Sequence, residues 1–291
     1  MQEKRLWFIL LLMSFYVSAQ TKGVVVDESG KPIPFVNIWV ENENIGTTSE
    51  ENGEFSISAS ANKNLIFSIL GFDKRIIKAS EVANVVLKAT SFQLDEVVIA
   101  RRFETRKLEI GQINNSPFEA FDNGPRIDVK FFPYETSYKR TRFIKKVSIL
   151  TDSRIDNATV KIHFYKVDSN GFPSDELLTK DFIVTIQKGV VRNGFDLTDL
   201  NLKMPKTGIF IGFEKLIIAK NKLEKTIINS NTGKTTTQIL YYPFVLYNYV
   251  ERDCLFTFSG GKWNRQTSEK SAGTSDKIKM YEPAINLVLT N

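Results

Sequence analysis

The sequence predicts an all-β protein in which a secretory signal peptide is followed by two β-sandwiches. Apolar and polar residues alternate in short runs, for example at 36–41 and 160–165, as they do in strands that bury one face. Gly, Asn, Asp and Pro close these runs, which is typical of turns between strands. A chain of 291 residues has room for about two domains. We expect these domains at 20–99 and 126–291, joined by a polar linker at 100–125.

Residues 1–19 have the pattern of a secretory signal peptide. Lys4 and Arg5 precede an apolar run at 6–16, and the small residues at 17–19 form a cleavage signal. The apolar run is shorter than the ~20 residues that a membrane-spanning helix needs. No comparable run follows, so we expect no spanning segment after the signal is removed. The expected location is the periplasm, the outer-membrane surface or the extracellular space.

The composition excludes several classes of protein. One histidine and one cysteine cannot supply a usual zinc site or an internal disulfide bond. The formal charge of +6 becomes +5 without the signal peptide, and the basic residues are dispersed, which gives no case for nucleic acid binding. Gln20 stands where a lipoprotein would need cysteine, and Cys254 is expected to be a small buried hydrophobe. We expect no metal and no cofactor.

The predicted first module contains a specific set of turn residues. Asp27 and Gly30 close its first strand, and Pro32-Ile33-Pro34 stiffens the entry to the second. Gly46-Thr47-Thr48 follows, and Asn52-Gly53 suits a tight hairpin. This set resembles the carboxypeptidase-regulatory-like domain, a transthyretin-like β-sandwich of seven strands found in bacterial envelope proteins. The resemblance implies that the module is an accessory to other domains.

The family name does not imply peptidase activity for this chain. A zinc carboxypeptidase site needs two histidines and a glutamate on the metal, whereas His163 is the only histidine here. We therefore expect a non-enzymatic protein with no catalytic residues.

The segment Leu94-Asp95-Glu96-Val97-Val98-Ile99 resembles the one that follows the same domain in TonB-dependent receptors of outer membranes. In those receptors a plug and a barrel of about 22 strands come next, and the rest of this chain is too short for them. A smaller barrel is a minority interpretation, because charges interleave on faces that lipid would contact. Those charged residues are Lys145, Lys146, Lys161, Lys180 and Asp181.

The second module is predicted to be a jelly-roll-like β-sandwich, because about eight strands can be counted in it. They are expected at 143–150, 160–167, 182–186, 190–197, 209–213, 239–246, 255–258 and 285–289. Residues 160–173 and 195–200 loosely resemble lectin-like and galactose-binding-like jelly rolls. Residues 221–228 are the best candidate for a short helix. Asp168-Ser169-Asn170-Gly171 is expected to be a turn rather than a calcium loop, and His163 to be a surface residue.

Aromatic residues give the best indication of function. Tyr242, Tyr247 and Trp263 lie near turns and strand ends, where flat rings can stack on sugars or on a partner protein. We take them as candidate ligand-binding residues, although core packing competes as an explanation for such a run. The predicted function is binding of a glycan or another envelope component, for example an envelope protein.

Two alternatives remain open at the level of sequence. The first is a structural or adhesive interaction protein without a small ligand. The second is a glycoside hydrolase that uses paired carboxylates, although no spacing singles out a pair. The acidic residues considered for it are Asp128, Asp152, Asp156, Glu176 and Glu214.

Overall fold

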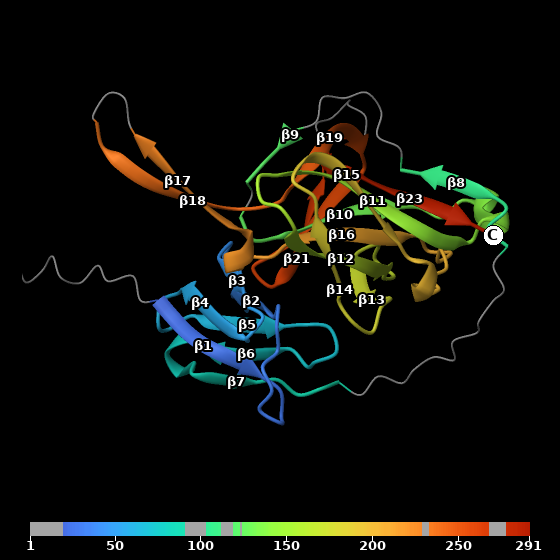
Figure 1. Ribbon diagram of the computed structural model, residues 1–291. Coiled ribbons are helices and arrows are strands. Elements are labelled where there is room, and N and C mark those ends of the chain that lie inside the picture. Colours follow the sequence, from blue (N-terminus) through green and yellow to red (C-terminus); the bar gives the residue numbers. More distant parts are fainter. Residues whose placement is uncertain (1–19, 91–102, 112–118, 123, 229–232, 268–277) are drawn as a thin grey trace, which may run out of the picture.

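The computed structural model describes residues 20–90, 103–111, 119–122, 124–228, 233–267 and 278–291. The predicted all-β class is confirmed: the described chain consists of strands, turns and a few short 3-10 helices, without an α-helix (Figure 1). None of the helices in these ranges is long and apolar enough to cross a membrane. The predicted signal peptide and the segment at 94–99 lie outside the described residues.

The first module is a sandwich of seven strands. They are β1 (Gln20–Val26), β2 (Asn37–Val40), β3 (Gly46–Thr48), β4 (Glu54–Ser58), β5 (Asn64–Ser68), β6 (Arg75–Lys78) and β7 (Asn84–Val86). One sheet has the order β4-β1-β7 and the other the order β3-β2-β5-β6. Alternating residues such as Val36, Ile38, Phe55 and Leu65 fill the core between the sheets. The connection between β3 and β4 is a tight turn, in which Gly53 has a φ of 78°, but it is not the predicted hairpin, because β3 and β4 belong to different sheets.

The second module is a larger sandwich. Its strands are β8 (Lys107–Ile110), β9 (Glu119–Ala120), β10 (Ile127–Phe132), β11 (Phe143–Ser153), β12 (Ala158–Val167), β13 (Pro173–Glu176), β14 (Phe182–Ile186), β15 (Gly189–Asp196), β16 (Ile209–Lys215), β19 (Phe244–Arg252), β20 (Cys254–Ser259), β21 (Lys262–Thr267), β22 (Ile278–Pro283) and β23 (Ile285–Thr290). We name its two sheets by their position relative to the first module. The inner sheet has the order β13-β12-β16-β10-β20-β21, with β14 beside β12. The outer sheet has the order β22-β19-β11-β23-β8, with β15 beside β11 and β9 beside β19.

Apolar side chains from both sheets form the core of this sandwich. Ile162, Phe164 and Ile211 come from the inner sheet, and Val147 and Leu287 from the outer one. The predicted two-sheet sandwich is therefore present, with more strands than the eight that were counted from the sequence. Most of the uncounted strands are short or polar, so their alternation is weak.

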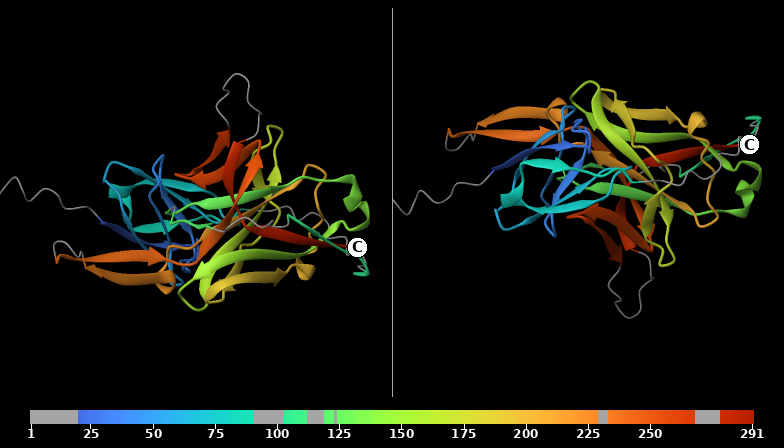
Figure 2. Two further views of the ribbon diagram at one scale, coloured as in Figure 1. Left: turned by 90° about the horizontal axis from the view of Figure 1, so that it is seen from above. Right: turned by 90° about the horizontal axis from the view of Figure 1, so that it is seen from below.

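A two-stranded ribbon stands apart from both sandwiches. It consists of β17 (Lys222–Ile228) and β18 (Thr235–Tyr241), which pair only with each other within the described chain. The ribbon projects from the body on the same side as the first module (Figures 1 and 2). The helix predicted at 221–228 is therefore wrong. Its last residues, Thr226, Ile227 and Ile228, are β-branched and favour a strand.

The first module is docked against the exposed face of the inner sheet. The Lys161 ammonium donates a hydrogen bond to the Phe35 carbonyl (2.7 Å), and the Ala219 N–H donates to the Glu50 carboxylate (2.7 Å). The Trp39 ring meets the edge of the Phe258 ring at 5.8 Å between centroids. Two views at right angles to Figure 1 show the modules side by side (Figure 2). The modules thus share a polar and aromatic interface.

Two further expectations differ from the structure. The run expected as one strand at 239–246 is divided between β18 and β19, because Tyr242-Pro243 interrupts it and Pro cannot donate to a sheet. The segment at 100–125, expected to be a linker, contributes β8 and β9 to the outer sheet. Its alternating Lys107-Leu108-Glu109-Ile110 places Leu108 and Ile110 against the core.

Candidate functional site

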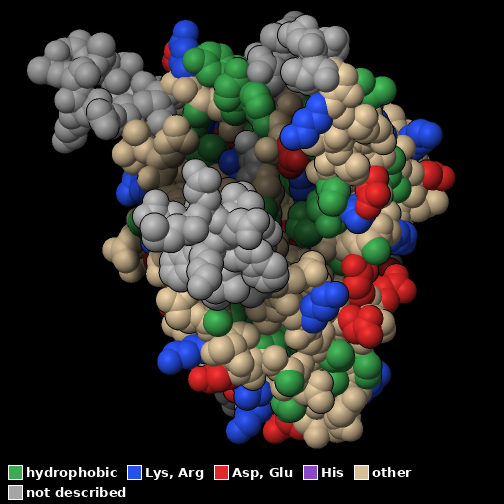
Figure 3. Space-filling view, turned by 90° about the vertical axis from the view of Figure 1, so that its left-hand side faces the viewer, with side chains coloured by type: hydrophobic (Ala, Val, Ile, Leu, Met, Phe, Trp, Pro, Cys, Tyr) green, Lys and Arg blue, Asp and Glu red, His purple; other side chains and the backbone are tan. Residues whose placement is uncertain are grey.

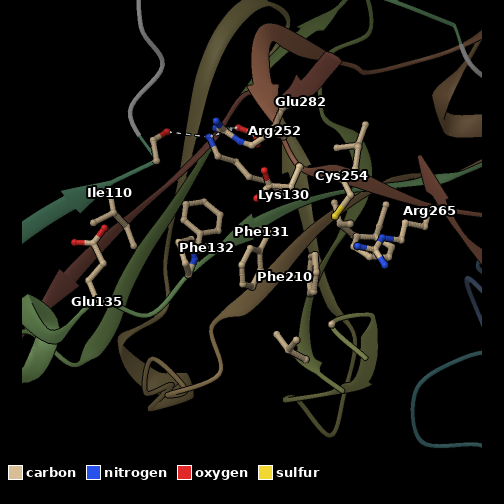
Figure 4. A pocket seen from close by; sticks show the side chains of 18 of the residues that line it. Ile110, Lys130, Phe131, Phe132, Glu135, Phe210, Arg252, Cys254, Arg265 and Glu282 are labelled. Carbon is tan, nitrogen blue, oxygen red and sulfur yellow. Dashed lines mark hydrogen bonds and ion pairs between the residues drawn. The ribbon is translucent and has the colours of Figure 1, made fainter. Parts of the chain in front are cut away.

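A large cavity lies where two neighbouring strands of the inner sheet separate. β10 pairs with β20 only at Ile127↔Phe258 and Asp128↔Thr257. Beyond this point the strands diverge, and a cavity of about 660 Å³ opens between them (Figure 4). Its volume falls within the range of typical small-molecule sites. We call it the wedge cavity.

Aromatic side chains form one wall of the wedge cavity. Phe131 of β10, Phe210 of β16 and Phe256 of β20 line it. The Phe131 and Phe210 rings lie 4.8 Å apart between centroids, and Phe210 meets Phe256 at 5.4 Å. Phe210 and Phe256 are buried, whereas Phe131 is 41% exposed. A ligand in the cavity would therefore meet a flat aromatic surface centred on Phe131.

Charged groups form the other wall. The Lys130 ammonium lies 3.1 Å from the Glu282 carboxylate and donates a hydrogen bond to the Gly111 carbonyl at 3.1 Å. Arg252 donates to both carboxylate oxygens of Glu282, at 2.6 and 2.8 Å. Figure 4 shows the three charged side chains meeting above Phe131 and Phe132. Burial lowers the pKa of Lys130, and the attraction of Glu282 offsets part of that effect.

Other charged residues lie nearer the rim of the wedge cavity. The Arg265 guanidinium lies 5.7 Å from the Phe256 ring centroid and 5.9 Å from that of Phe172. Among the described residues it has no ion-pair partner. Glu135 and Asp253 are exposed and also line the cavity. The rim therefore carries charges of both signs, which water can screen.

The structure does not bring the three predicted aromatic residues together. Tyr242 and Tyr247 are buried, and their rings offer almost no surface to a ligand. Tyr247 donates a hydrogen bond to Asp128 (2.7 Å) and accepts one from Arg126 (3.1 Å). Trp263 is half-buried on the face of the inner sheet that the first module covers. Its ring contacts Tyr165 and Phe258 there. None of the three predicted residues lines the wedge cavity.

The single histidine is buried, which corrects the expectation of a surface residue. His163 Nδ1 lies 2.5 Å from Glu176 and Nε2 lies 2.8 Å from Glu214. Its ring stacks on Tyr165 at 5.3 Å. Burial works against the charged imidazole, but the two carboxylates outweigh it and raise the His163 pKa to about 10. The imidazolium therefore holds two of the candidate catalytic carboxylates.

Lys161 is also buried and Asp181 partly buried, although both were expected on an outward face. They form an ion pair at 2.9 Å beside the first module. The alternation of β12 correctly puts Lys161 and His163 on the face opposite Ile162 and Phe164. That face is covered by the first module, which local sequence does not reveal.

The five acidic residues considered for a hydrolase do not meet in the wedge cavity. Asp128 is buried against Arg126 and Tyr247, while Glu176 and Glu214 contact His163. Neither Asp152 nor Asp156 lines the cavity. Among the described residues no three His, Cys, Asp or Glu side chains are placed to hold a metal ion together.

The sequence contains one local signal for the wedge cavity. Asp128 and Lys130 alternate with Ile127, Val129 and Phe131, so β10 has one charged and one apolar face. The charged face points into the sandwich, because Asp128 and Lys130 reach residues of the outer sheet. Charged side chains on the core-facing side of a strand indicate a binding site or a buried ion pair.

Comparison with known families identifies the first module. Residues 21–99 match the family described as the CarboxypepD_reg-like domain, which confirms the resemblance seen in the turn residues. The chain is 29% identical over 98 residues to TonB-dependent receptor SusC of Bacteroides thetaiotaomicron, covering 34% of this chain and 10% of the receptor. It is 35% identical over 112 residues to TonB-dependent receptor P3 of Formosa agariphila, covering 36% of this chain and 11% of the receptor.

These relatives are much longer proteins, and this chain spans about a tenth of their length. Among solved structures, one of infectious bursal disease virus, Gx strain, aligns with 93% of this chain and 59% of its own. The TM-score is 0.22 and the identity 9%, so this alignment carries no argument about fold or function.

Proposed function

We propose that this chain is an exported, non-enzymatic protein of the bacterial envelope, and that its second sandwich binds a glycan in the wedge cavity. The receptor names of the relatives and the family of the first module support an envelope role. The observation that carries the binding role is the wedge cavity itself. It joins an exposed aromatic face at Phe131 to hydrogen-bond donors at Arg252 and Arg265.

A sugar ring fits this combination of walls. One face of a pyranose presents C–H groups that pack against an aromatic ring, and its hydroxyls accept hydrogen bonds from guanidinium groups. A hydrolase would in addition need two carboxylates on opposite sides of the scissile bond. The buried carboxylate Glu282 is already held by two cations, which supports binding over hydrolysis.

The test is a glycan array followed by calorimetry with the Phe131→Ala variant. Loss of the aromatic face should weaken glycan binding by about tenfold or more. Tyr249→Ala is a matched control, because Tyr249 is 48% exposed and lies outside the wedge cavity. If no glycan binds, or if Phe131→Ala binds as tightly as the unaltered protein, the proposal fails.

One observation favours a second candidate, an adhesive interaction protein without a small ligand. Ile227, Ile228 and Ile239 are exposed on the ribbon of β17 and β18. Exposed apolar side chains on a projecting element often mark a contact with another protein. Figure 3 shows that basic, acidic and hydrophobic side chains all occur on the side of the molecule from which the ribbon projects.

A further inference from the structure

We propose that the glycan bound in the wedge cavity is acidic, and that its carboxylate or sulfate group binds to Arg252 and Lys130. This inference rests on the proposed function and deepens it by naming the ligand class. It is based on the charges at the buried end of the cavity. There, two cations share the single carboxylate of Glu282.

The charge count at that end leaves one positive charge in excess. Among the described residues, Glu282 is the only carboxylate within ion-pair distance of Lys130 or Arg252. The side chains of Lys130 and Glu282 are 4% and 3% exposed, so water screens them poorly. The excess charge is that of Arg252, whose side chain is 43% exposed toward the cavity, and an anionic ligand group would pair with it beside the poorly screened Lys130 and Glu282.

The donors also have the right geometry for an anion. Arg252 uses Nε and Nη2 for Glu282, and Nη1 donates to the Glu251 carbonyl at 3.0 Å. A guanidinium has five N–H donors, so two stay available to a ligand. The Arg252 side chain is 43% exposed, which lets a ligand reach it from the cavity. Arg265, which has no ion-pair partner among the described residues, supplies a second cation at the rim.

The acidic groups at the rim do not cancel this preference. Glu135 and Asp253 are exposed, and neither forms an ion pair with a cation of the cavity. Figure 4 shows Glu135 near Ile110, on the opposite side from Arg265. Exposed charges that are not in contact contribute little at physiological ionic strength, whereas Arg252 and Lys130 can contact the ligand group directly.

The test compares acidic glycans with their neutral derivatives, by calorimetry on the full chain. One pair is oligogalacturonate and its methyl ester, and the other is a sulfated galactan oligosaccharide and its desulfated form. These pairs also distinguish a carboxylate from a sulfate. At least one acidic member should bind about tenfold or more tightly than its neutral counterpart, and added salt should reduce that difference.

The Arg252→Gln variant tests the site. It leaves Lys130 and Glu282 as a neutral pair, so the fold should persist while the preference for the acidic member disappears. Arg192→Gln is the matched control, because Arg192 is exposed on β15, outside the wedge cavity. This variant should keep the preference.

The outcomes separate this inference from the proposed function. Equal binding of acidic and neutral members, or an unchanged preference in Arg252→Gln, overturns the proposal of an acidic ligand. The proposal that the cavity binds a glycan would then still stand. Absence of binding by these probes and by every glycan on the array overturns both. Binding of an acidic peptide in place of any glycan likewise overturns both.

Discussion

The single histidine acts as a buried cation that joins two carboxylates on neighbouring strands. His163 lies on β12, Glu214 on β16 and Glu176 on β13, so the contacts tie three strands of the inner sheet together. Burial raises the Glu214 pKa, but the hydrogen bond and charge of His163, with smaller contributions from Lys161 and Asn37, together outweigh burial and the net shift is downward. The three residues therefore form a charged unit within the folded protein.

The stability of this unit depends on pH with a definite sign. The His163 pKa is about 10 in the folded protein and 6.5 for the free side chain. Its contribution to the free energy of unfolding is fully present below pH 6.5 and is lost as the pH rises toward 10. Glu214 has a lowered pKa, so its contribution is lost as the pH falls below 4.5.

We predict that His163→Gln lowers the free energy of unfolding by about 3 kcal/mol at pH 6, because the buried Glu214 and the partly buried Glu176 lose their cation. The loss of stability between pH 6.5 and 10 should also be smaller in the variant than in the unaltered protein. Urea unfolding at pH 6, 8 and 10 measures both effects. The double variant His163→Gln/Glu214→Gln is the control. It removes one of the two carboxylate charges that are left without a cation, and should recover part of the stability. Parallel pH profiles for the single variant and the unaltered protein would contradict the prediction.

At the scale of elements, β10 shows that the alternation of a strand does not identify which of its faces points into the main core. Its apolar face, Ile127, Val129 and Phe131, points away from the main core, and its charged face points into it. Alternation gives the two faces of a strand but does not say which one is covered. Ile127 and Val129 are nevertheless buried, because they form a second cluster with Tyr165, Phe210 and Phe256.

The ribbon of β17 and β18 is the element with the weakest connection to either core. An isolated hairpin is marginally stable in water, and most of its side chains are exposed. We predict that Ile228→Ser changes the free energy of unfolding by no more than about 0.5 kcal/mol. The same substitution at buried Ile211 of β16 should cost about 3 kcal/mol or more. Urea unfolding compares the two.

A large loss of stability in Ile228→Ser would show that the ribbon packs against the body in solution. If its stability is unchanged, the variant can then be used to test the adhesive candidate. Reduced binding to an envelope protein, with glycan binding intact, would assign the protein contact to the ribbon.

At the scale of the whole molecule, the two modules are held by contacts along the inner sheet. Asn42 donates its N–H to the Gly260 carbonyl (3.1 Å), and Ile217 donates to the Thr48 hydroxyl (3.1 Å). Trp39 is buried, although it points away from the core of its own module. Such an interface predicts that the modules move together.

We predict that Trp39→Ala separates the modules, because it removes the ring that packs on Phe258. The radius of gyration from X-ray scattering should rise, and unfolding should change from one transition to two. The cost at the interface should be about 3 kcal/mol. Ile76→Ala, on the exposed edge strand β6 of the same sheet, is the control and should leave both measurements unchanged. Scattering that is identical for Trp39→Ala and the unaltered protein would contradict the prediction.

The sequence correctly predicted the strands and turns that depend on a local pattern of residues. Runs such as 182–186 and 255–258 have strong alternation or continuous apolar character, and the structure has strands there. The first module was predictable because turns at Asp27 and Gly53 need particular residues. The wedge cavity was not, because Lys130, Arg252 and Glu282 come from strands far apart in the chain and meet only after folding.

The docked interface also has a consequence for synthesis. The first module has its own apolar core and leaves the ribosome before the second. When β12 emerges, a folded surface that includes the Phe35 carbonyl already exists for Lys161 to contact. A nascent second module can therefore assemble against a preformed template. A protein made without residues 20–90 would have to fold with Lys161 and Phe258 uncovered, and we expect it to misfold more often.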